Sequence, residues 1–98
     1  MKVYISGPIT GIDRFMDNFD KAEEWLVMRG YDTCNPAREN SKYPAGTEWR
    51  VYMGESLKLL CGCQAIYMLE GWQRSEGAKL EYLVATHLGM KVMEEDKR

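Results

Sequence analysis

The chain has 98 residues, of which 45% are hydrophobic and 29% are charged, and its formal net charge is −2 at pH 7. This length and composition are typical of one globular domain, residues 1–98, with a single core. The small negative charge lacks the basic footprint of a protein that binds the nucleic-acid backbone. No apolar run approaches the roughly 20 residues that cross a bilayer, and no signal-peptide pattern follows Met1. We therefore expect a cytoplasmic protein that binds neither a nucleic-acid polymer nor a membrane.

The first half of the chain predicts two strands and one helix before a long loop. A β-rich run at residues 2–6 is broken by glycine and proline, and a helical apolar pattern then extends from Phe15 to Val27 with Gly30 as its stop. A second strand is expected at residues 31–35, because the proline that follows it disfavours continuation. Residues 36–46 are expected to form a loop, long enough to be functional.

The second half predicts two more helices and two more strands. Thr47 is expected to cap a helix that runs to about Leu60. Residues 64–69 are the most hydrophobic strand, as a central parallel strand should be. A further helix, with Ser75 as N-cap, is expected to stop at Gly89. A short last strand at residues 90–93 and a frayed, charged tail at residues 94–98 complete the chain.

This alternation of strands and helices predicts an α/β protein: a single Rossmann-like or flavodoxin-like three-layer domain with a small parallel sheet of about four strands. Such sheets bind ligands at the carboxyl ends of their strands. Two glycine-rich loops are expected there, residues 6–11 and residues 70–77. The first loop has neither the Gly-Lys-Ser/Thr ending of a phosphate loop nor a G-x-G-x-x-G pattern, so we expect no dinucleotide.

The cysteines and the histidine do not predict a metal centre. Cys34, Cys61 and Cys63 are an odd number, as in a protein from a reducing compartment, and no second cysteine pair accompanies the last two. His87 is the only histidine, so a zinc ion would lack ligands. It is also expected at the far end of its helix, as a boundary residue rather than a catalytic base. We expect structural thiols, no metal and no cofactor.

Glu81 occupies an unusual position for a carboxylate. At about 100° per residue it falls opposite Lys79, among apolar side chains that should face a core or a cleft. An ionised carboxylate is costly to desolvate unless something compensates it. Glu81 is therefore either an edge residue that reaches water or a functional carboxylate in the cleft. The glycine-rich loop that enters its helix favours the second interpretation.

The aromatic residues divide into two groups. Trp25 and Trp49 fit the apolar faces of their helices, so we expect them in the core or in a dimer contact. Trp72 lies in the second ligand loop, where stacking on a base and packing as part of a lid are equally compatible with its position. Tyr43, in the long loop, is another candidate for stacking on a base.

Two stretches, Tyr4–Gly11 and Cys63–Glu81, together with the pair Asn35-Pro36, resemble the nucleoside 2-deoxyribosyltransferase-like superfamily. The resemblance is closest to its small phage and prophage branch (DUF4406-like), and the chain is also similar to 2′-deoxynucleoside 5′-phosphate N-hydrolases. It extends over nearly the whole chain, and the two motifs are specific only in combination.

The resemblance implies cleavage of the N-glycosidic bond, or deoxyribosyl transfer, on 2′-deoxynucleosides or their 5′-monophosphates. A glutamate attacks the anomeric carbon, and water or a second base resolves the glycosyl-enzyme intermediate, as in a retaining glycosidase. The family glutamate follows a glycine by four positions, as Glu81 follows Gly77, and the tyrosine that orients it corresponds to Tyr4. The implied partners are a small-molecule nucleoside or nucleotide and a second copy of the chain, in a homodimer.

The resemblance also implies substrate-binding residues. Six positions before the glutamate, nucleoside transferases carry an aspartate, whereas monophosphate hydrolases carry a serine that contacts phosphate; here it is Ser75. A role as helix cap alone also accounts for Ser75, and Arg74 is either a phosphate partner or a solvated loop charge. The full expected set is Ser6, Gly7, Pro8, Ile9, Thr10, Gly11, Ser56, Gly71, Trp72, Arg74, Ser75 and Gly77.

Two positions depart from the family pattern. Ser56 stands where relatives carry an aspartate near the base and sugar, and Glu55 lies about 100° around the helix from it. Gln64 replaces a second aspartate that looks structural. Loss of a general acid slows cleavage by about 10²–10⁴-fold. The alternatives are therefore a non-catalytic nucleotide-binding module with the same pocket, or a structural, partner-binding protein.

Overall fold

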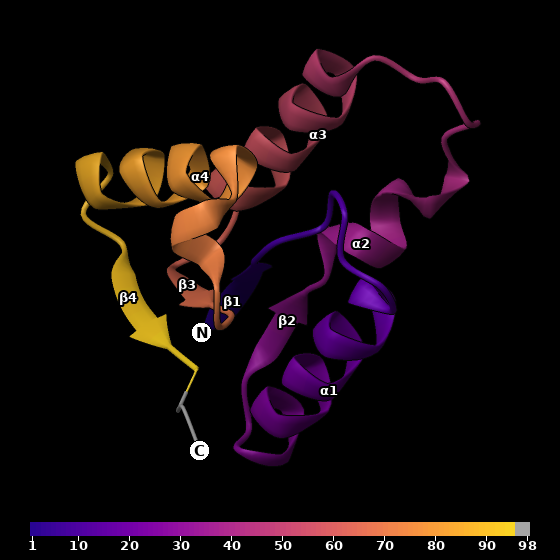
Figure 1. Cartoon of the computed structure of the whole chain (residues 1–98). Coiled ribbons are helices and arrows are strands. Elements are labelled where there is room, and N and C mark those ends of the chain that lie inside the picture. The colour runs from indigo at the N-terminus through magenta and orange to yellow at the C-terminus, as the bar shows by residue number, and fades with distance from the viewer. Residues whose placement is uncertain (96–98) are drawn as a thin grey trace.

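The β-forming runs of the sequence pair into one parallel sheet in the computed structural model, which describes residues 1–95 (Figure 1). Within these residues the strands are β1 (Lys2–Ser6), β2 (Asp32–Cys34), β3 (Ala65–Met68) and β4 (Lys91–Glu94). Their order is β2-β1-β3-β4, and every neighbouring pair is parallel. The predicted α/β fold with a small parallel sheet is confirmed. Of the expected tail, residues 96–98 lie outside the described residues.

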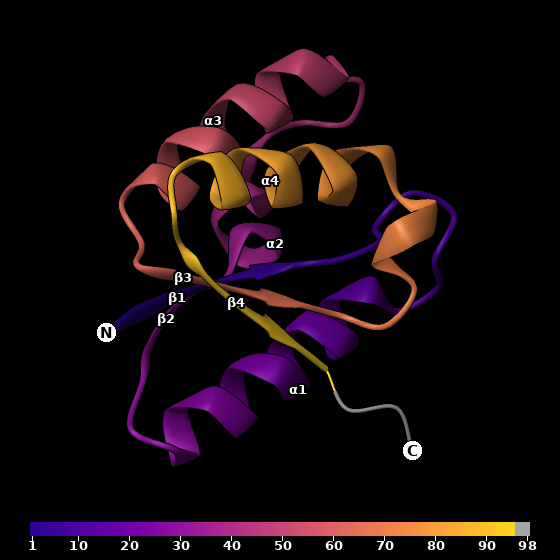
Figure 2. The ribbon, with the colours of Figure 1, turned by 90° about the vertical axis from the view of Figure 1, so that its left-hand side faces the viewer.

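Helices cover both faces of this sheet. Figure 2 shows α1 on one side of the strands and the pair α3 and α4 on the other, which gives the expected three layers. The long helices are α1 (Phe15–Met28), α3 (Trp49–Cys61) and α4 (Glu76–His87). No helix in the described part of the chain is long and apolar enough to cross a membrane.

The alternation of side chains along β1 divides the core into two clusters. Val3 and Ile5 pack against Phe19 of α1 on one face. Tyr4 points to the other face, where it lies in a cluster with Leu60 of α3. Tyr4 has no exposed surface, so its hydroxyl must find hydrogen-bond partners inside the protein.

The helix stops expected from the sequence are present. Gly30 has φ +88° and follows the end of α1, where the amide of Tyr31 donates to the carbonyl of Leu26 at 3.2 Å. Ser75 caps α4, because its side-chain oxygen accepts a hydrogen bond from the amide of Ala78 at 3.1 Å.

The expectation that residues 36–46 form a loop throughout is wrong for residues 36–42. The segment begins with a short helix, α2 (Pro36–Glu39), which continues into a 3-10 turn, η1 (Asn40–Lys42). Asn35 is the physical reason, because its side chain accepts a hydrogen bond from the amide of Arg38 at 3.3 Å. The proline that follows it occupies the first helical turn, where a missing N–H leaves no bond unmade.

Three further expectations need correction. Thr47 does not cap α3: its hydroxyl donates to the carbonyl of Pro44 at 2.7 Å, and Glu48 occupies the cap position without a side-chain bond. Trp25 and Trp49 are not core residues, because they are 39% and 54% exposed, and the alternative of a dimer contact stays a prediction. Trp25 instead stacks on Tyr67, with ring centroids 5.5 Å apart, beneath the guanidinium of Arg29 at 3.6 Å.

Candidate active site

A cavity of about 1350 Å³ opens where the loops after β1 and β3 meet α2 and the first turns of α3 and α4. This is the carboxyl end of the parallel strands, where such sheets bind ligands. Its volume exceeds the roughly 300–1,000 Å³ of most small-molecule sites, so a nucleoside or nucleotide would fit. Aromatic side chains line much of the wall, namely Phe15, Phe19, Tyr43, Trp49 and Tyr52.

Glu81 forms part of the cavity wall and yet is almost entirely buried, with 7% of its surface exposed. The hydroxyl of Tyr4 donates to its Oε2 at 2.6 Å, and the hydroxyl of Ser6 donates to its Oε1 at 2.6 Å. Each carboxylate oxygen is therefore held by one hydroxyl. These two hydroxyls of β1 compensate the negative charge of Glu81 and fix the orientation of its carboxylate.

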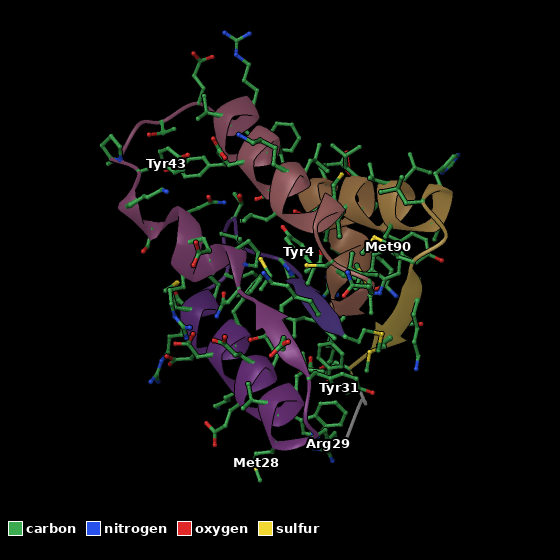
Figure 3. The ribbon with its side chains drawn as sticks, turned by 180° about the vertical axis from the view of Figure 1, so that it is seen from behind. Tyr4, Met28, Arg29, Tyr31, Tyr43 and Met90 are labelled. Atoms are coloured by element: carbon green, nitrogen blue, oxygen red, sulfur yellow. The ribbon has the colours of Figure 1, made fainter. Side chains whose placement is uncertain are left out.

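The sequence produces this arrangement through simple periodicities. Tyr4 and Ser6 are two residues apart on β1, so both side chains point to the face of the sheet that α4 crosses. The cap at Ser75 starts α4 beside the carboxyl end of β1, which brings Glu81 over these hydroxyls in the second turn of the helix. Figure 3 shows Tyr4 in the interior and Tyr43 on the segment that precedes α3.

Burial and hydrogen bonding act in opposite directions on Glu81. Desolvation raises the pKa of its carboxyl group, while the bonds from Ser6 and Tyr4 lower it, and the net pKa lies above the ordinary value. Burial, and then the nearby charge of Glu81, raise the pKa of Tyr4 well above its ordinary value. Tyr4 therefore remains a protonated hydrogen-bond donor at neutral pH. Such a carboxylate, ordered and poorly solvated, suits nucleophilic attack.

Two more polar residues, Ser56 and Asn40, lie on the cavity wall near Tyr4. Ser56 of α3 is 6% exposed, and its hydroxyl makes a hydrogen bond with that of Tyr4. The amide nitrogen of Asn40, from η1, donates to the Ser56 oxygen at 3.0 Å. Sequence reasoning missed Asn40, because its segment was interpreted as a loop.

Two comparisons place the chain among known proteins. The family described as "Domain of unknown function (DUF4406)" matches residues 1–94. The chain belongs to this family. Among solved structures, a 2-deoxyribosyltransferase of the psychrotolerant bacterium Bacillus psychrosaccharolyticus superposes on it with a TM-score of 0.75 at 16% identity, covering 100% of this chain and 77% of that chain. At this identity the likeness is one of fold. No curated protein matches.

The second loop of this DUF4406 protein brings four of the expected residues to the cavity, of which Gly71 is the first. Arg74, Ser75 and Gly77 all line it, and Ser75 retains its hydroxyl proton for a ligand because capping uses only its oxygen. A side chain at Gly71 would place its Cβ 3.1 Å from the Arg74 guanidinium, so the absence of a side chain lets the guanidinium lie against the loop.

Some expected residues lie elsewhere. Gly11 and Trp72 are not on the cavity wall. Trp72 packs on Tyr82, with ring centroids 4.6 Å apart, and its indole nitrogen donates to Glu94 at 3.3 Å. The Trp72 ring is therefore already stacked on another side chain of the protein. From the first loop, the wall includes Gly7, Pro8, Ile9 and Thr10.

The cysteines and histidine of this DUF4406 protein lie apart from the cavity wall. Cys34 and Cys63 are buried free thiols, whereas Cys61 is exposed. His87 is exposed near the end of α4, away from Glu81. Among residues 1–95, no group of three or more histidine, cysteine, aspartate or glutamate side chains is arranged to hold a metal ion.

Proposed function

We propose that this DUF4406 protein cleaves the N-glycosidic bond of 2′-deoxynucleosides or their 5′-monophosphates, or transfers the deoxyribosyl group, with Glu81 as the nucleophile. The observation that carries the proposal is a buried carboxylate, held at both oxygens by Tyr4 and Ser6, on the wall of a cavity of nucleotide size. The likeness in fold to a 2-deoxyribosyltransferase supports it.

The chemistry is a double displacement. A Glu81 oxygen attacks the anomeric carbon, the bond from carbon to base nitrogen breaks, and the bonding electrons leave with the base. Water or a second base then attacks the same carbon and releases the carboxylate. The Tyr4 and Ser6 hydroxyls orient Glu81 for attack and stabilise it again when it leaves.

The cavity also offers groups for the rest of a nucleotide. Arg74 and Ser75 lie at the N-terminus of α4, where backbone amides and the helix dipole favour an anion such as a 5′-phosphate. Tyr43 and Trp49 present aromatic surface on the wall, suited to stacking on a base.

A non-catalytic nucleotide-binding module is the second candidate, and the other acidic group of the wall favours it. Besides Glu81, Glu76 is the carboxylate among the lining residues, and it is paired with Lys79 at 2.6 Å on the surface. Ser56, at the position where an aspartate was expected from the resemblance, is not an acid. Among residues 1–95, the side chains that line the cavity therefore give the departing base no obvious carboxylic proton donor besides Glu81 and the paired Glu76.

A product assay decides between these functions. The folded protein is incubated with each deoxynucleoside and each deoxynucleoside 5′-monophosphate, with ribonucleosides as controls, and free base is measured by chromatography. Release of base from a deoxy substrate is the expected result. A nucleotide that raises the melting temperature without being consumed would instead support the binding module, because a ligand stabilises the state that binds it. Release from no substrate would exclude the catalytic proposal.

Arg74→Ala is expected to weaken the binding of 5′-monophosphates by about 10- to 100-fold, the effect of one hydrogen bond to a charged group. Binding of the corresponding nucleosides should stay within about twofold of the wild-type value, because no phosphate is present for Arg74 to contact. Isothermal titration with matched nucleoside and monophosphate pairs measures both. Arg50→Ala is the matched control, since Arg50 is exposed and does not line the cavity. Equal losses for both ligands would contradict a phosphate role.

A further inference from the structure

Four polar side chains from four different elements form one continuous hydrogen-bonded chain. Asn40 of η1 donates to Ser56 of α3 at 3.0 Å, and Ser56 makes a hydrogen bond with Tyr4 of β1. Tyr4 donates to Glu81 of α4 at 2.6 Å. This row of hydrogen bonds has both of its ends, Asn40 and Glu81, on the cavity wall.

The chemistry of the groups fixes the direction of this chain. An amide nitrogen can only donate, so the Ser56 oxygen must accept the bond from Asn40. The single Ser56 proton is then available for the Tyr4 oxygen, and the single Tyr4 proton is available for Glu81. An ionised carboxylate is an acceptor at every position, so it suits the end of a chain in which every proton points toward it.

We propose that Asn40 and Ser56 are positioning residues, which keep the Tyr4 hydroxyl directed at Glu81 and thereby hold the carboxylate ionised and aimed into the cavity. The direction of the hydrogen bonds follows from which of these groups can donate and which can only accept. The consequence for turnover rests on the function proposed above. Both residues line the cavity, and in this role they act on Glu81 through Tyr4.

The electrostatic surroundings agree with this direction. The bond from Ser56 lowers the pKa of Tyr4 against the larger effect of burial, which makes the Tyr4 hydroxyl a stronger donor. The other titratable group that acts on Tyr4 is Cys34 of β2. A hydrogen bond with Cys63 and burial raise the pKa of the Cys34 thiol, so Cys34 brings no charge to this region at neutral pH. Of the two titratable groups that act on Tyr4, only Glu81 is then ionised at neutral pH.

The direct test is the titration of the Glu81 carboxyl carbon by NMR, in protein labelled at its glutamate carboxyl groups. The signal is assigned by its loss in Glu81→Gln. Ser56→Ala is expected to raise the pKa of Glu81 by roughly 0.3 to 1 unit, because Tyr4 becomes a weaker donor. Ser56→Thr keeps the hydroxyl and should restore the wild-type titration.

Asn40→Asp tests the direction itself. A carboxylate at this position cannot donate, so the Ser56 proton should turn toward it and leave Tyr4 without a donor. The pKa of Glu81 should then rise at least as far as in Ser56→Ala. The new negative charge also raises this pKa directly, and the double variant Asn40→Asp/Ser56→Ala, which has no Ser56 hydroxyl to turn, measures that part. Asn40→Ala, in which Ser56 can still donate to Tyr4, should shift the pKa less. Thr33→Ala is the control, because it removes a similar hydroxyl-to-carboxylate bond, to Glu23 at 2.7 Å, away from the cavity.

Steady-state kinetics add a second measurement on the same variants. In Ser56→Ala, kcat should fall about tenfold with KM little changed, and the acidic limb of the pH profile should move to higher pH. A Glu81 titration in Ser56→Ala equal to that of the wild type, or a Ser56→Thr variant that titrates like Ser56→Ala, would overturn the positioning role. Because the titration needs no turnover, it remains decisive even if no substrate is cleaved.

Discussion

Glu81→Gln is expected to lower turnover by at least about 10³-fold while nucleotide binding and the fold persist. Glutamine keeps the volume of the side chain and can still bond to Tyr4 and Ser6, but it lacks the attacking oxygen. Single-turnover assays and calorimetric titration with the same deoxynucleotide measure the two effects separately. Retained activity in a folded Glu81→Gln variant would end the proposal of a glycosyl-enzyme intermediate.

The same variant carries a prediction about stability and pH. The pKa of Glu81 is raised above its ordinary value of 4.5 in the folded state, so the folded protein binds more protons than the unfolded chain between these two values. The stability that this group contributes is therefore fully present below pH 4.5 and is lost as the pH rises through the folded pKa. Glu81→Gln does not titrate, so its melting temperature should exceed that of the wild type increasingly across this window.

Thermal unfolding of both proteins between pH 4 and pH 8 checks the sign. Glu24→Gln, at an exposed position of α1, is the control for a general change in net charge. A wild-type protein more stable than Glu81→Gln at neutral pH would mean that Glu81 serves mainly to tie the loops together through its hydrogen bonds. That result would favour a structural role for the carboxylate.

Gly7→Ala is expected to destabilise the protein by about 1–3 kcal/mol and to weaken ligand binding. A Cβ at Gly7 would lie 2.7 Å from the Cβ of Leu69 and 2.8 Å from its Cδ1, so the loop after β1 must move. Leu69 is 3% exposed and follows β3, which leaves it little freedom to retreat. Because Gly7 lines the cavity, the displaced loop should reshape the ligand site as well.

Gly54→Ala is the matched comparison, and its expected effect has the opposite sign. Gly54 lies within α3 and is exposed, and a Cβ there would meet nothing within 4 Å apart from its chain neighbours and the backbone of its own helix. Alanine in a helix is favoured over glycine by roughly 0.5–1 kcal/mol, so this variant should be more stable than the wild type. Urea unfolding of both variants gives the two signs. A Gly7→Ala protein as stable as the wild type would show that the loop after β1 can move away from Leu69 at no cost in stability.

The order of the elements could be predicted because each one carries its own local pattern. The run at residues 64–69 is short and apolar, and Gly30 and Ser75 mark helix ends. The helix α2 was missed because a single turn is too short to show a helical period. Its cap, Asn35, was the available signal, and that helix brings Asn40 to Ser56.

Side-chain surroundings were harder to predict than elements. Periodicity located the apolar face of α3 but could not show whether Trp49 on that face meets the core or an open cavity. It likewise could not show that the Trp72 ring is already covered by Tyr82. For Glu81, the pattern showed that the carboxylate is out of place among apolar residues. Which hydroxyls hold it depends on how β1 and α4 cross, and that is a property of the whole fold.

The distance along the sequence between Glu81 and its partners has a consequence for biosynthesis. Tyr4 lies 77 residues before Glu81 and Ser6 lies 75 residues before it, so the two sides of the carboxylate site are synthesised many residues apart. Loop closure over such separations is slow, and a nascent chain that stops short of α4 holds two buried hydroxyls with no acceptor. A chain without α4 therefore lacks the complete carboxylate site. The site is complete only when α4 docks on the sheet and Glu81 meets these two hydroxyls.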